Sequence, residues 1–86
     1  MIDGMKITSS GTKYWYKDFN FHREDGPAIE YSNGDKYWYQ RGKFHRLDGP
    51  ALEFHNGSKY WYYQGEEIKC SSQKEFEKIL KLKHFW

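Results

Sequence analysis

The sequence predicts an α+β fold in which about six strands form an antiparallel β-meander of tandem hairpins, with one C-terminal amphipathic helix packed on one face. Three observations predict it: a repeat with a period of 23 residues, Asn-Gly pairs inside that repeat, and a helix-capping signal after it. At 86 residues the chain is long enough for one domain, 1–86, which we divide into a repeat sheet over 5–70 and a helix over 72–86.

The repeat determines the architecture. The segment KYWY occurs at 13–16, 36–39 and 59–62, and HRxDGPA occurs at 22–28 and 45–51. The first copy is partial and the third departs from the pattern after Tyr62. Each period contains two runs rich in aromatic and aliphatic residues, so we expect two strands in each copy.

The Asn33-Gly34 and Asn56-Gly57 pairs predict hairpins closed by two-residue type I′ turns, since such turns need positive φ at both centres. The resulting register sorts side chains onto two faces of the sheet. One face carries Trp15, Ile29, Tyr31, Trp38, Leu52, Phe54 and Trp61. The other carries Tyr14, Tyr16, Tyr37, Tyr39, Tyr60 and Tyr62, with Glu30 and Glu53 between them.

The end of the chain predicts the helix. Ser72 and Glu75 form a capping box, and apolar residues recur after it with the period of an α-helix. The apolar side of this helix comprises Phe76, Ile79, Leu80, Leu82 and Trp86, and Lys74, Lys78 and Lys81 lie opposite. We expect the apolar side to lie across the face that carries the tryptophans.

Composition excludes several classes of function. The net charge of +2 is too balanced for a dedicated DNA-binding protein, and the high aromatic content of 21% argues against disorder. The one cysteine, Cys70, permits neither an internal disulfide nor a zinc site built from cysteine pairs, and we expect it to be a small junction residue. No stretch is apolar enough to span a membrane. We therefore expect a soluble, cytoplasmic protein without cofactor or metal.

The HRxDGP segment brings His, Arg and Asp close together, but a structural role is favoured over catalysis. Asp, Gly and Pro are turn-forming residues, and a segment that recurs in each copy is typical of a device that joins repeats. Arg23 and Arg46 are expected to pair with Asp25 and Asp48. No nucleophile stands beside a base, so we expect no enzyme activity.

Two resemblances bear on this repeat. Gly42, Lys43 and His45 match the G-K-x-H turn of MORN repeats, which are consecutive β-hairpins with the same period, although Arg46 stands where those repeats have Gly. The combination of GxKYWY with HRxDGPA resembles more closely the short repeat proteins found in bacteriophage genomes. Both resemblances imply a sheet of hairpins over residues 5–70, and neither implies a particular activity.

The leading functional hypothesis is a small, non-enzymatic, phage-type protein that occludes a host protein, such as a defence nuclease complex, in the manner of an anti-CRISPR protein. The tyrosine face would make the contact, because tyrosine is enriched at interfaces. The rim of that surface would comprise His22, Arg23, His45 and Arg46. A homodimer through the sheet edge or the tyrosine face is a further expectation.

Two alternatives stay open. Nucleic acid or nucleotides would bind through the His/Arg loops and the basic helix, whose lysines are Lys74, Lys78, Lys81 and Lys83. The MORN resemblance implies instead a scaffold or a membrane-surface module.

Overall fold

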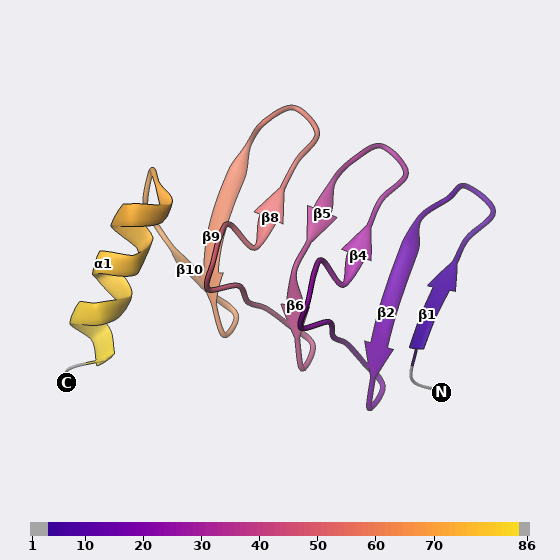
Figure 1. Ribbon diagram of the computed structural model, residues 1–86, viewed down its shortest axis with the longest axis horizontal. Helices are drawn as coiled ribbons and strands as arrows, with labels where there is room; N and C mark the ends of the chain where they lie inside the picture. Colours follow the sequence, from indigo (N-terminus) through magenta and orange to yellow (C-terminus); the bar gives the residue numbers. More distant parts are fainter. Residues whose placement is uncertain (1–3, 85–86) are drawn as a thin grey trace.

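A computed structural model describes residues 4–84 and shows a row of β-hairpins with one helix at its end (Figure 1). The principal extents of 43 × 30 × 17 Å are those of a thin slab, as expected for a single-layer sheet. The strands are β1 (Gly4–Ile7), β2 (Lys13–Lys17), β3 (Asn20–Phe21), β4 (Ile29–Glu30), β5 (Lys36–Tyr37), β6 (Tyr39–Gln40), β7 (Lys43–Phe44), β8 (Leu52–Glu53), β9 (Lys59–Tyr63) and β10 (Glu66–Ile68), and the helix is α1 (Gln73–His84). The main sheet has the order β1-β2-β4-β5-β8-β9-β10, which confirms the meander and the α+β class.

The strands outnumber the expected six partly because the strand before each KYWY segment of the second and third copies is interrupted, and partly because the KYWY strand of the second copy divides at Trp38 into β5 and β6. Strands β3 and β4 both pair antiparallel with β2, one after the other along its length, so they run in the same direction. The HREDGPA segment at 22–28 therefore interrupts a strand and does not reverse the chain, which corrects the expectation of a turn there. We call this segment, and its equivalent at 45–51, an excursion from the strand. The Trp15 carbonyl accepts the His22 N–H at 3.1 Å and the Trp15 N–H donates to the Ala28 carbonyl at 2.8 Å, so hydrogen bonds to Trp15 fix both ends of the first excursion.

The hairpin turns differ from the prediction. Tyr31 N–H donates to the Asp35 carbonyl, which leaves a three-residue loop of Ser32, Asn33 and Gly34. Only Gly34 has positive φ in it, at 102°, and the Asn33 side chain accepts the Asp35 N–H at 3.0 Å. A polar side chain that satisfies the backbone in this way favours the longer loop over a type I′ turn.

Positive φ at both central residues, the signature of type I′, occurs at the opposite end of the sheet. The three turns there are Asp18-Phe19, Arg41-Gly42 and Gln64-Gly65. They join each KYWY strand to the strand that follows it.

The longer loop shifts the register by one residue and so changes which side chains share a face. Ile29 pairs with Tyr37, and Leu52 pairs with Tyr60, so both aliphatic side chains lie with the tyrosines and not with the tryptophans. Tyr31 and Phe54, each two residues further along the chain, lie on the same face as these aliphatic residues. We call this side the aromatic face; its rings are Tyr14, Tyr16, Phe21, Tyr31, Tyr37, Tyr39, Phe44, Phe54, Tyr60 and Tyr62.

The opposite side, the tryptophan face, carries Trp15, Trp38 and Trp61. Glu30 and Glu53 also lie here, which corrects their predicted place between the tyrosines. Along this face the paired residues alternate in charge in the order Lys13, Glu30, Lys36, Glu53, Lys59. Opposite charges on neighbouring strands stabilise a sheet by roughly 0.2–1 kcal/mol per pair.

The helix begins as the capping box predicts. Glu75 N–H donates to Ser72 Oγ at 3.2 Å, while the Glu75 carboxylate accepts the N–H of Ser71 at 3.2 Å. Its buried residues Phe76 and Leu80 pack with Trp61 and Ile68.

The helix covers only the last hairpin and does not extend across the whole tryptophan face, as Figure 1 shows from its position beyond β10. Ile79 is partly buried against the same cluster. Leu82 is 56% exposed and does not join the core, contrary to prediction, and Trp86 lies outside the described residues.

Candidate functional site

The rings of the aromatic face form an unbroken row across the repeats. Tyr16 stacks on Phe21 at 5.1 Å, Phe21 lies 5.3 Å from Tyr39, and Tyr39 stacks on Phe44 at 4.5 Å. Phe44 in turn lies 5.0 Å from Tyr62. Because each ring is held by rings of the next copy, the row is a rigid surface and not a set of independent side chains.

A second row lies nearer the three-residue loops. Tyr37 contacts Tyr31 at 5.0 Å and Phe54 at 5.9 Å, both edge-to-face. Ile29 and Leu52, which share this face, are only 3% and 9% exposed. The rings therefore bury the aliphatic residues of the sheet without a second layer.

The aromatic face is nearly free of charge. Among the described residues, Lys6 opposite Tyr14 and Glu67 opposite Tyr62 share it at its two ends, and Asp35 lies opposite Tyr31 beside the three-residue loop. Burial raises the pKa of Tyr39, and neighbouring tyrosines add to the effect, so its hydroxyl stays neutral at physiological pH. Within residues 4–84 the helix packs on the other side, so nothing described covers this face.

The structure brings together all six tyrosines predicted as a site and adds Phe21 and Phe44, which sequence reasoning missed. Their signal was available, because each stands five residues after the second tyrosine of a KYWY segment. Tyr60 is the most exposed of the six tyrosines at 42%, and the others are half-buried.

The four His and Arg residues predicted for the rim lie elsewhere. The Arg23 and Arg46 guanidinium groups stack on Trp15 and Trp38 at 3.9 and 3.8 Å from the ring centres, which places them on the tryptophan face. His22 and His45 bind backbone groups near the type I′ turns. These residues and the tyrosines therefore belong to different surfaces.

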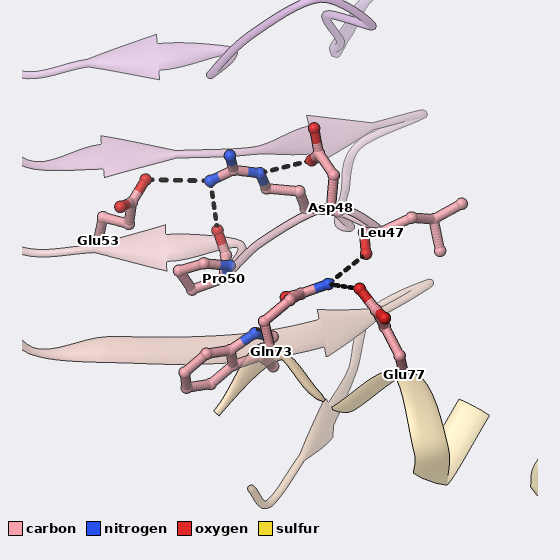
Figure 2. A network of polar contacts seen from close by, with 8 residues as sticks. Leu47, Asp48, Pro50, Glu53, Gln73 and Glu77 are labelled. Carbon is pink, nitrogen blue, oxygen red and sulfur yellow. Dashed lines mark hydrogen bonds and ion pairs between the residues drawn. The ribbon is translucent and has the colours of Figure 1, made fainter. Parts of the chain in front are cut away.

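Each arginine holds one HRxDGP excursion together. Arg46 Nε donates to Asp48 at 2.8 Å, and its Nη1 donates to the Pro50 carbonyl at 3.1 Å and to Glu53 at 3.0 Å (Figure 2). The Arg46 guanidinium lowers the pKa of the Asp48 carboxyl through that hydrogen bond. Arg23 makes the same three kinds of contact in the preceding copy, as the predicted Arg–Asp pairing required.

The third tryptophan has no such arginine, because the repeat ends before one is reached. Instead Trp61 Nε1 donates to the Gln73 side chain at 2.9 Å. Gln73 Nε2 donates to the Leu47 carbonyl and to Glu77, each at 2.8 Å, and so ties the start of α1 to the second excursion (Figure 2). The start of α1 thus covers Trp61 in the last repeat, as an arginine covers the equivalent tryptophan in each of the two preceding copies.

The two histidines join neighbouring repeats. His22 Nδ1 accepts the N–H of Arg41 at 2.9 Å, and the Phe21 carbonyl accepts the N–H of Gly42 at 3.0 Å, so one copy binds both free amides of the next type I′ turn. His45 Nδ1 accepts the Gln64 N–H in the same way, and burial lowers the pKa of the His45 imidazole.

A polar groove of about 540 Å³ runs along these turns, and we call it the turn groove. Its lining residues are Lys17, Asp18, Asn20, His22, Glu24, Gln40, Arg41, Lys43, His45 and Gln64. Sequence reasoning did not predict this groove, since it depends on turns that were assigned to the other end of the sheet.

The basic helix is a weaker surface than its sequence suggests. Lys74, Lys78 and Lys81 are exposed, but Lys83 pairs with Glu66 at 3.0 Å. Glu75 and Glu77 lie among the lysines on α1, so the helix offers phosphate groups no uniform positive strip.

The described residues offer little for catalysis or metal binding. In 4–84 no three His, Cys, Asp or Glu side chains gather where they could hold a metal ion. Cys70 is half-buried beside the helix core, and burial raises the pKa of its thiol, which disfavours the reactive thiolate. Nor does the described helix have the length and apolar character needed to cross a membrane.

Comparison of the chain with protein-family models found no match, and comparisons with curated proteins and with solved structures found none either. Function is therefore argued from the surfaces themselves.

Proposed function

We propose that this protein is a small, non-enzymatic binding module that occludes the surface of another protein with its aromatic face. One observation carries the proposal: a continuous, neutral row of rings extends across all the repeats, and the helix lies on the opposite side of the sheet.

Such a face suits protein recognition for physical reasons. Tyrosine provides a large contact area with few rotatable bonds, so little conformational entropy is lost on binding. The ring-to-ring contacts reduce that loss further, because they already order the side chains in the free protein. The molecule, helix included, extends 43 and 30 Å along its two longer axes, so its broad side has room for the roughly 800 Å² that each partner buries in an ordinary interface.

The surface favours a protein over a nucleic acid or a membrane. Single-stranded nucleic acids need aromatic rings together with a basic groove along the backbone, and Lys6 is the one cation that the strand register places on this face among residues 4–84. Binding to anionic membranes needs a cluster of basic residues, which the face also lacks.

The resemblance to phage repeat proteins suggests the kind of partner. A host protein, such as a defence nuclease complex, would be blocked by steric occlusion in the manner of an anti-CRISPR protein. An affinity pull-down from bacterial lysate, performed with and without added nuclease, separates the two classes of partner. Capture of the same protein in both samples supports the proposal, while captured material that disappears after nuclease treatment refutes it.

Substitution on the two faces of one strand tests which side binds. Tyr60→Lys places a charge on the aromatic face at its most exposed ring, and Lys59→Ser changes the opposite face of the same strand. We expect the first to weaken binding of the captured protein by about tenfold or more, as truncation of an interface anchor does, and the second to leave it unchanged. Equal affinities for the wild type and a correctly folded Tyr60→Lys variant would exclude this face.

A further inference from the structure

Phe19 stands in a conformation that its residue type does not favour. It is the second central residue of the β2–β3 turn, with φ of 67°, where the other two copies have Gly42 and Gly65. Left-handed backbone is costly for a residue with a bulky side chain. The ring is also 71% exposed, so it gains little core packing in return. The folded state therefore gives no reason for phenylalanine at this place.

Three cations line the turn groove, whose lining also includes Asp18 and Asn20, the two chain neighbours of Phe19. Lys17 is two residues before Phe19, and Arg41 and Lys43 come from the equivalent turn of the next copy. None of the three side chains forms an ion pair within the described part of the chain, whereas Arg23 and Arg46 are fully engaged. The groove therefore presents positive charge that is available to a ligand.

The same groove contains a buried donor without an acceptor. His22 Nδ1 accepts the Arg41 N–H, so in the neutral imidazole the proton lies on Nε2. Among the described side chains, His22 Nε2 is the buried polar atom that lacks a hydrogen-bond partner. Glu24 Oε1 is 3.9 Å away, too far for a hydrogen bond. An acceptor that entered the groove, with a small movement of this loop, would satisfy it.

We infer that the turn groove binds an acidic segment of a protein partner, with its carboxylates at Lys17, Arg41 and Lys43 and an apolar side chain against Phe19. Charge complementarity and the exposed ring select this occupant. Asp18 and Glu24 also line the groove and repel phosphate and carboxylate alike, so the preference for a peptide rests on the exposed Phe19 ring, against which a peptide can place an apolar side chain beside its carboxylates.

This surface is separate from the aromatic face. Lys17 and Gln40 alternate with Tyr16 and Tyr39 along their strands, so their side chains point to the opposite side of the sheet. The inference therefore does not rest on the proposed occlusion by the aromatic face, and either can fail alone.

A titration of the ¹⁵N-labelled full chain followed by NMR tests it. The probe is the capped peptide acetyl-Glu-Glu-Leu-Glu-Glu-amide, and its matched control is acetyl-Lys-Lys-Leu-Lys-Lys-amide, each up to about 1 mM, which detects weak binding. We expect shifts from the acidic peptide alone, confined to residues 17–24, 40–45 and 64. No shift, equal shifts from both peptides, or shifts centred on the helix would overturn the inference.

Variants separate binding from folding. Phe19→Gly should raise the thermal midpoint, because glycine favours this turn. The same substitution should weaken binding of the acidic peptide by about fivefold. Lys43→Gln should weaken binding of the acidic peptide by a similar factor, whereas Lys78→Gln on the helix should leave this binding unchanged. A Phe19→Gly protein that is more stable and binds the peptide as tightly as the wild type would reduce Phe19 to a turn residue and refute its role. Stronger shifts of the same residues by an oligothymidine would assign the groove to nucleic acid instead.

Discussion

Replacement of Arg46 by alanine should destabilise the fold strongly although the residue lies near the surface. The substitution removes the hydrogen bonds from Nη1 to Glu53 and to the Pro50 carbonyl and the stacking on Trp38. A hydrogen bond to a charged group contributes about 1.5–3 kcal/mol, and a cation–π contact at a partly exposed site about 0.5–1 kcal/mol. The bond to Asp48 adds little, because that carboxylate is 86% exposed. The expected loss is about 2–4 kcal/mol in the free energy of unfolding.

Urea unfolding followed by tryptophan fluorescence measures this loss. With a slope near 1 kcal/mol per molar, usual for a small domain, the midpoint should fall by roughly 2–4 M. Arg46→Lys keeps the charge but not the planar group, so it should lose about half as much. Leu47→Ala, a neighbouring residue that is 56% exposed, is the control and should change the midpoint little.

The outcome also distinguishes a structural role of the HRxDGP segment from a role in binding a partner. A midpoint for Arg46→Ala within about 0.5 M of the wild type would show that the arginine contacts do not hold the repeat. The residue would then be free to serve a partner, as the sequence-based hypothesis for the rim supposed.

Three further predictions follow from single contacts. Because burial lowers the pKa of His45 in the folded state, the unfolded chain binds the proton more tightly, so stability present above about pH 6.5 should be lost as the pH falls below it. Protonation of Nδ1 would also break the bond to Gln64 N–H, and urea midpoints at pH 7.5 and 5 should differ less in a His45→Asn variant; an equal difference contradicts this. Gln73→Ala leaves Trp61 Nε1 without its acceptor and should cost about 1–2 kcal/mol in urea unfolding, with a red shift of native fluorescence; unchanged emission would mean that the helix start does not cover the ring. Gly57→Ala should cost about 1 kcal/mol from backbone strain alone, because φ is 93° and nothing lies within 4 Å of the added methyl, while Gly57→Asn should cost less; equal thermal midpoints for all three proteins would contradict the strain.

Much of the fold was predictable because the repeat and the helix signals are local. The period placed two strands in each copy, and Ser72 with Glu75 marked the start of the helix. The tyrosines were correctly placed together because residues two apart on a strand share a face in any register. Their neighbours were misplaced, since which aliphatic residue joins them depends on the length of the loop.

That loop length depends on contacts between copies. Thr12 Oγ1 accepts the Ser32 N–H at 3.3 Å, and Asp35 accepts the His55 N–H at 2.8 Å, so each three-residue loop is tied to the next hairpin. An Asn-Gly pair by itself favours a two-residue type I′ loop, whereas the bond from Asp35 N–H to the Asn33 side chain favours the three-residue loop. Bonds between loops 20 residues apart add to this local bond and stabilise the longer loop further.

The sequence by itself determined the repeat, the class of fold, the capped helix and the grouping of the tyrosines, because each follows from residue types at short range. Only the tertiary structure decided the register, and with it the placing of Glu30 and Glu53 beside the arginines. It also decided that type I′ turns form at Arg41-Gly42 and its equivalents, where the preceding copy supplies His22 to bind the turn amide. The physical reason is the same in both cases: a shift of one residue exchanges the two faces of a strand, and the contacts that fix it come from neighbouring repeats.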